Sequence, residues 1–133
     1  MKYKKHIKQS IAMENQQKKE HFLTVVSNAG WKLLTKGNTP DLGGATGITV
    51  IGVAVWDNLS MEALGKLAAK SYSKSMIYVF DFDDCLTVQE MGNYAPGIQG
   101  VQKEPIVAEY INGKLSQILE GSAAVDWMLK MVK

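Results

Sequence analysis

A β-hairpin near the carboxyl end constrains this chain more than any other feature. An apolar run rich in β-branched residues, Ile106–Ile111, leads into Asn112-Gly113, and a second run, Lys114–Leu119, follows. A two-residue type I′ turn needs positive φ at both central residues, and Asn-Gly meets that need at little cost. Pro105 stands at the start of the first run, where a missing N–H does least harm to a ladder. The pattern predicts two antiparallel strands.

Two other apolar segments predict central strands of a sheet. Ile48–Val55 is continuously apolar and β-branched, which is typical of a strand buried on both faces. Met76–Phe82 has the same character, and between the two lies a helical pattern with lysines on its outer side. Its predicted buried stripe comprises Met61, Leu64, Leu67 and Ala68. Strand, helix and strand in this order predict a parallel βαβ unit.

Two further helices are predicted from apolar residues that repeat at helical spacing. The first contains Phe22, Val25, Val26 and Ala29, and Gly30 stands where it would end. The second closes the chain, and its apolar face comprises Val125, Met128, Leu129 and Val132. Ser122 is expected to cap this last helix, and Thr87 to begin a short one through Met91.

The order of features around the hairpin resembles the carboxyl half of thioredoxin-fold proteins. Pro105, Gly113 and Gly121 have the spacing familiar from that family: a proline, a strand, an Asn-Gly turn, a strand, a glycine and a closing helix. The resemblance covers the chain from about Ile48 onward. It implies an α/β protein, a three-layer α/β/α sandwich with a mixed sheet and helices on both faces. Residues 22–133 would form this domain, and residues 1–21 a basic, helical or frayed extension.

The resemblance also implies where a functional surface would lie, and the residues at that place differ from those of thioredoxins. Thioredoxins carry Trp-Cys-Gly-Pro-Cys where a strand meets a helix, and here the same places read Trp56-Asp57-Asn58-Leu59-Ser60. Thiol–disulfide exchange needs a thiolate and a second sulfur, which a carboxylate and a hydroxyl cannot replace. Asp57 and Ser60 are the residue types that cap a helix. Thioredoxin-type reductase activity is therefore not expected at this site.

The proline is the second part of that surface. In the family the proline at this strand start is cis, and its neighbours make backbone contacts with bound peptides. The resemblance implies the same for Pro105, although Glu104 replaces the usual apolar or threonine residue before it. The leading hypothesis is a redox-inactive adaptor that binds a protein or peptide through Trp56, Asp57, Ser60, Glu104 and Pro105.

Two enzymatic alternatives remain open from the sequence. The single cysteine, Cys85, would be a lone redox thiol, but the carboxylates of Asp81, Asp83 and Asp84 disfavour the reactive thiolate. The same stretch, FDFDDCLT, resembles the first motif of haloacid-dehalogenase-type phosphatases, which implies Asp81 as nucleophile and Asp83 as acid/base beside Mg²⁺. Cys85 departs from that motif, and no adjacent acidic pair follows it. A thioredoxin-like strand that merely ends in acidic residues explains the stretch better.

Composition limits the remaining function classes. The formal net charge of +2 gives no argument for a specific nucleic-acid partner, although lysines 2, 4, 5, 8, 18 and 19 make the first twenty residues basic. His6 and His21 are the only histidines, so with one cysteine no ordinary zinc site can be assembled. No apolar run approaches the roughly 18 residues of a membrane span. No cofactor, metal or membrane is expected, the cytoplasm is the expected location, and the oligomeric state is open.

Overall fold

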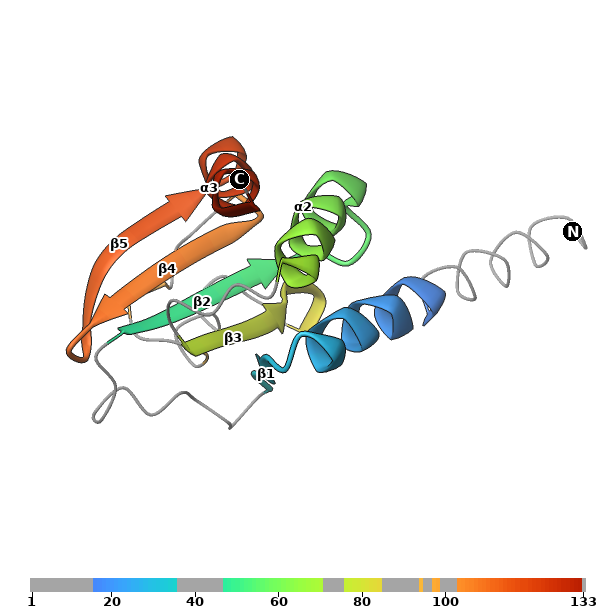
Figure 1. Ribbon diagram of the computed structural model, residues 1–133, viewed down its shortest axis with the longest axis horizontal. Helices are drawn as coiled ribbons and strands as arrows, with labels where there is room; N and C mark the ends of the chain where they lie inside the picture. Colours follow the sequence, from blue (N-terminus) through green and yellow to red (C-terminus); the bar gives the residue numbers. More distant parts are fainter. Residues whose placement is uncertain are drawn as a thin grey trace, which may run out of the picture.

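Five strands form one mixed sheet in the order β1-β3-β2-β4-β5 (Figure 1). The computed structural model describes residues 16–35, 47–70, 76–84, 94, 97–98 and 103–132. The strands are β1 (Lys32–Leu33), β2 (Gly47–Val53), β3 (Met76–Asp81), β4 (Ile106–Ile111) and β5 (Lys114–Glu120). β1, β3 and β2 run parallel to one another, whereas β4 is antiparallel to β2 and β5 is antiparallel to β4.

The predicted hairpin is confirmed, including its turn. Asn112 has φ 52° and Gly113 has φ 83°, the positive values that a type I′ turn demands. The register shifts between Glu109 and Tyr110, an irregularity that no local pattern announced.

The register of β2 against β4 decides which loops meet. Gly52 lies opposite Ile106, so the carboxyl end of β2 is beside the amino end of β4. The segment that leaves β2 and the segment that enters β4 therefore emerge from the same end of the sheet. These are the two segments that carry the residues singled out from the sequence.

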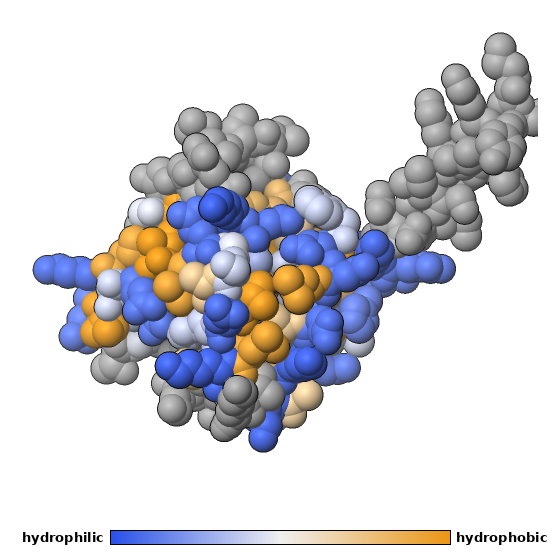
Figure 2. Space-filling view, turned by 90° about the horizontal axis from the view of Figure 1, so that it is seen from above, coloured by the Kyte–Doolittle hydropathy of each residue, from blue (hydrophilic) through white to orange (hydrophobic). Residues whose placement is uncertain are grey.

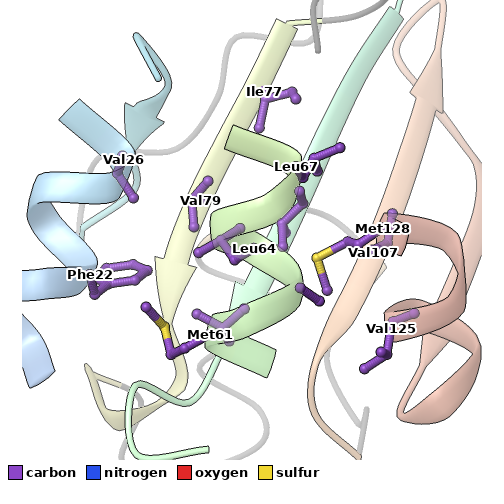
Figure 3. Close-up of a cluster of buried hydrophobic side chains, with 14 of the residues drawn as sticks. Phe22, Val26, Met61, Leu64, Leu67, Ile77, Val79, Val107, Val125 and Met128 are labelled. Atoms are coloured by element: carbon purple, nitrogen blue, oxygen red, sulfur yellow. The ribbon is translucent and has the colours of Figure 1, made fainter. Parts of the chain in front are cut away.

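Three α-helices of the described residues pack on one face of the sheet, and a short 3-10 helix, η1 (Phe82–Asp84), follows β3. The α-helices comprise residues 16–28, α2 (Asn58–Ala69) and α3 (Ser122–Val132). Figure 3 shows Phe22 and Val26 of the first helix, Leu64 of α2 and Met128 of α3 gathered over this face, where β3 contributes Val79. None of the helices in the described ranges has the length and apolar character needed to cross a bilayer.

The opposite face of the sheet is covered in part by the chain between β3 and β4. A second cluster buries Val50 and Phe80 of the sheet with Tyr94 and Ile98, which come from the chain between β3 and β4. The ring of Tyr94 stacks on that of Phe80 with centroids 4.9 Å apart. The short helix expected from Thr87 lies outside the described residues, so the three α-helices of the described part all belong to the first face.

Two element ends differ from the predictions, each for a local reason. β2 ends at Val53 and not Val55, because the chain turns there and the Asp57 N–H donates to the Ala54 carbonyl at 3.0 Å. The cap of α3 is Gly121, not Ser122: the Gly121 carbonyl accepts the first helical bond, and its φ of 61° favours glycine.

The first helix runs through position 21, after which the sequence analysis placed a domain boundary. Phe22 and Val26 are both buried in the core of the sheet's helical face. The helix ends at Gly30, which has φ 74° as expected of a helix terminator. Part of the predicted extension is thus continuous with a helix that is docked on the sheet.

Two glycines give a matched test of this packing. A Cβ on Gly52 would lie 2.5 Å from Phe80 Cζ and 3.0 Å from Ile106 Cγ1, whereas a Cβ on Gly65 of α2 would meet nothing within 4 Å. We expect Gly52→Ala to lower the free energy of unfolding by about 1–3 kcal/mol, since the centre of the sheet has no room. Gly65→Ala should raise it by about 0.5–1 kcal/mol through helix propensity. Urea unfolding measures both, and equal stability of the two variants would contradict this packing.

Candidate functional site

The turn from β2 into α2 folds its polar side chains inward. Asp57 is the N-cap of α2, with φ −88° and ψ 107°. Its Oδ1 accepts the Leu59 N–H at 3.2 Å, and its Oδ2 accepts the Ser60 hydroxyl at 2.6 Å. Ser60 is fully buried. The two predicted polar site residues are therefore bonded to each other and to the start of the helix.

The same turn directs its large apolar side chains outward. Trp56 is 54% exposed and Leu59 is 57% exposed, although the neighbouring Val55 and Met61 are buried. The cap explains the exposure of Leu59, because a helix start that turns Asp57 and Ser60 toward the protein leaves the intervening Leu59 facing solvent. Figure 2 shows that hydrophobic residues reach the surface in several groups among hydrophilic ones on the face seen there.

The second predicted part of the surface is the start of β4. The Glu104-Pro105 peptide bond is cis, as the family resemblance implied. Pro105 is buried, and its carbonyl accepts the Gly121 N–H at 2.9 Å. Its ring therefore supports this end of the sheet from inside, whereas Glu104 is partly exposed. The exposed residues of these two segments include Trp56, Leu59, Asn58 and Lys103, and sequence reasoning had not selected Leu59.

A second group of charges lies at the carboxyl end of β3. The Asp81 side chain is 1% exposed, and its Oδ2 lies 2.6 Å from Lys19 Nζ. The same ammonium lies 3.2 Å from both carboxylate oxygens of Asp84. It also sits 5.5 Å from the centroid of the Phe22 ring. This ion pair ties the first helix to the end of β3.

The pKa of Lys19 follows from these contacts. Partial burial lowers the pKa, but the hydrogen bonds and charges of Asp81 and then of Asp84 outweigh it. The net effect is a pKa raised above its ordinary value of 10.5. Lys19 therefore stays charged at every physiological pH.

Sequence reasoning missed Lys19, which it had assigned to the basic extension. The available signal was spacing: Lys19, Phe22 and Val26 stand at i, i+3 and i+7, on one face of a helix. A lysine on the buried face of a helix needs a carboxylate partner within the protein, because burying an unpaired charge is costly.

The residues of the two enzymatic alternatives are only partly described. Asp81 is buried and paired with Lys19, as expected of a carboxylate that stabilises the fold. Its position therefore offers the phosphatase hypothesis no support. The Asp83 side chain and Cys85 lie outside the described residues. Within the described ranges, no group of three or more histidine, cysteine, aspartate or glutamate side chains is placed to hold a metal ion.

Solved structures similar to this one are thioredoxins. Thioredoxin from Plasmodium falciparum superposes with a TM-score of 0.56 at 18% identity, over 76% of this chain and 95% of that one. Thioredoxin of Malassezia sympodialis gives 0.54 at 12% identity, over 76% and 87%. Mitochondrial thioredoxin 3 of Saccharomyces cerevisiae gives 0.51 at 16% identity, over 80% and 96%. These likenesses establish a thioredoxin-like fold.

Comparisons by sequence give no further assignment. No protein-family model matches the chain, and no curated protein matches it either.

The role of Asp57 as a helix cap is testable by a graded pair of substitutions. Asp57→Ala removes the acceptor of the Leu59 N–H and of the buried Ser60 hydroxyl. We expect it to lower the free energy of unfolding by about 1–2 kcal/mol. Asp57→Asn keeps one acceptor oxygen and should lose less than half as much. Urea unfolding of both variants checks this order, and an undiminished stability of Asp57→Ala would show that the cap is not needed.

The Lys19–Asp81 pair should matter far more than an exposed pair on α2. Lys19→Met removes the cation that lies 2.6 Å from the buried Asp81 carboxylate. We expect a loss of about 2 kcal/mol in unfolding free energy, less than the roughly 3–5 kcal/mol of a fully buried pair, because the Lys19 side chain is 32% exposed. Lys66→Met is the matched control, because Lys66 and Glu62 are both more than half exposed. Such a pair contributes at most about 0.5 kcal/mol.

The pH dependence of the Lys19 effect has a definite sign. Because the pKa of Lys19 is raised in the folded protein, the pair stabilises fully below pH 10.5 and is lost as pH rises through the raised pKa. Burial raises the pKa of Tyr110 to about 12, so deprotonation of this tyrosine also destabilises the fold in strong alkali. This second effect is the same in wild type and in Lys19→Met. The difference between wild type and Lys19→Met should thus persist at neutral pH and shrink in strong alkali. A difference that grew with alkaline pH would contradict the assignment.

Proposed function

We propose that this protein is a redox-inactive, thioredoxin-like adaptor that binds an extended segment of a protein partner around Trp56 and Leu59. The observation that carries the proposal is the orientation of the side chains in the turn before α2. Asp57 and Ser60 are engaged in the helix cap, and the two large apolar side chains of the turn are more than half exposed. A surface built in this way has binding energy to offer and no reactive group.

The energetics favour recognition by this pair. Tryptophan is among the residues that most often dominate the energy of protein interfaces. Covering apolar surface contributes about 25 cal/mol per Å², so burying Trp56 and Leu59 under a partner is worth on the order of a few kcal/mol. Pro105 and Gly121 brace the neighbouring strand start, because the Pro105 carbonyl and the Gly121 N–H are bonded to each other. The surface is therefore preorganised, which lowers the entropic cost of binding.

The chemistry of the described residues supports binding over catalysis. Disulfide exchange by one chain needs two sulfurs, and the chain has a single cysteine. The Ser60 hydroxyl is fully buried, so no substrate reaches it in this conformation. A single cysteine also fits a reducing compartment, and we propose the cytoplasm as the location.

A library of random twelve-residue peptides displayed on phage tests the proposal. We expect wild-type protein to select peptides whose affinity, measured by isothermal titration, falls at least tenfold with Trp56→Ala/Leu59→Ala. The matched control is Met76→Ala/Ile111→Ala, which removes two exposed apolar side chains at the opposite end of the sheet. It should bind like wild type.

Two results would overturn the proposal. One is a selection that enriches no peptide, and the other is an equal loss of affinity in both double variants. Cys85→Ser addresses the thiol alternative separately, since a non-covalent adaptor keeps its peptide affinity without that sulfur.

A further inference from the structure

A cavity of 280 Å³ opens between the first helix and the start of α2. The first helix contributes Gln17, Lys18 and His21, and the β2–α2 segment contributes Val55, Asn58 and Met61. Two of these residues are direct neighbours of the exposed pair, because Val55 precedes Trp56 and Asn58 precedes Leu59. Residues that line the cavity are therefore adjacent in sequence to the residues proposed to bind a partner.

The cavity has an apolar floor and a small volume. Val55 and Met61 are both buried and form the part that faces the core. Sites for cofactors and drug-sized ligands usually occupy about 300–1,000 Å³, so this cavity lies just under that range. Methionine adapts its shape to what it contacts, which suits a floor that receives a flexible or aromatic group. The fitting occupant is a single large apolar side chain.

The mouth of the cavity is positively charged. Lys18 is half-buried there, and no carboxylate is among the described residues that line the cavity. The printed ion pairs of the described residues engage Lys19 and Lys66, and none involves Lys18.

Three acidic residues of the described ranges lie close in sequence to the residues that line the cavity, and each has a partner of its own. Asp57 caps α2, Glu62 pairs with Lys66, and Glu20 accepts a bond from Gln16 at 3.4 Å. Lys18 is the one side chain with a permanent charge among the described residues that line the cavity, and His21 is another lining residue. A carboxylate on the occupant would be complementary to the Lys18 ammonium.

We infer that the cavity receives a large apolar side chain of the partner, and that Lys18 selects an acidic residue next to that side chain. The partner segment would lie over Trp56 and Leu59 and place this anchor between the two helices. The inference rests on the proposed function and adds the sequence preference of the bound segment.

The same phage library tests this preference with charge-matched variants. We expect wild type to enrich an apolar residue flanked by aspartate or glutamate. Lys18→Glu should lose the acidic preference and bind the wild-type peptides on the order of tenfold more weakly. Lys130→Glu, an exposed position on α3, makes the same change in net charge and should select like wild type.

A second variant addresses the cavity itself without relying on charge. Asn58→Trp places a bulky side chain at the exposed mouth of the cavity and should abolish the apolar preference. Circular dichroism and urea unfolding establish that the variant is folded before its selection is read.

The outcomes separate this inference from the proposed function. If Lys18→Glu and Asn58→Trp select the same peptides as wild type, while Trp56→Ala/Leu59→Ala abolishes binding, the adaptor proposal stands and the cavity assignment is wrong. If wild type binds no peptide, both are wrong.

A third experiment uses the anionic aromatic dye 1-anilinonaphthalene-8-sulfonate. If wild type binds the dye, Asn58→Trp does not, and no peptide is selected, the cavity is a site for small apolar acids and the peptide assignment is wrong.

Discussion

The burial of β2 is the constraint on which the rest of the structure depends. This strand is paired on both sides, with β3 and with β4, and every residue after its first is buried. Its side chains alternate between the two clusters, with Val50 on one face and Ile51 on the other. Both faces must therefore be covered, by three helices on one side and by Tyr94 and Ile98 on the other. Gly52 marks the closest approach, where Phe80 occupies the space of a side chain.

Because β2 cannot shift, the turn that follows it is held at a defined place. There the Asp57 cap draws the polar groups inward and leaves Trp56 and Leu59 in solvent. The proposed binding surface is thus a consequence of satisfying the first N–H groups of a helix. In this respect the surface has the construction of a binding site, with a rigid base and exposed apolar contacts.

The first helix enlarges that surface. Its apolar residues Phe22 and Val26 reach the core, and Lys19 reaches the end of β3, so the helix is fixed at two kinds of contact. Fixing the helix brings Lys18 and His21 beside the start of α2 and thereby creates the cavity. A helix that the sequence pattern assigned partly to an extension is, in the folded chain, one wall of the proposed site.

What the sequence by itself determined is what depends on neighbours along the chain. The Asn112-Gly113 turn, the apolar strands, the helix cap of Asp57 and the thioredoxin-like order of elements all follow from local conformational preference and periodicity. The exposed pair was half visible, since Trp56 was selected and Leu59 was not.

Only the tertiary structure decided the contacts between distant segments. Lys19 and Asp81 are separated by 62 positions, and the local sequence around either residue does not predict the other as its partner. The burial of Pro105, the gathering of three described helices on one face and the cavity between two of them likewise depend on packing. Local preferences act over a few residues, whereas these features arise from burying apolar surface and pairing charge across the whole sheet.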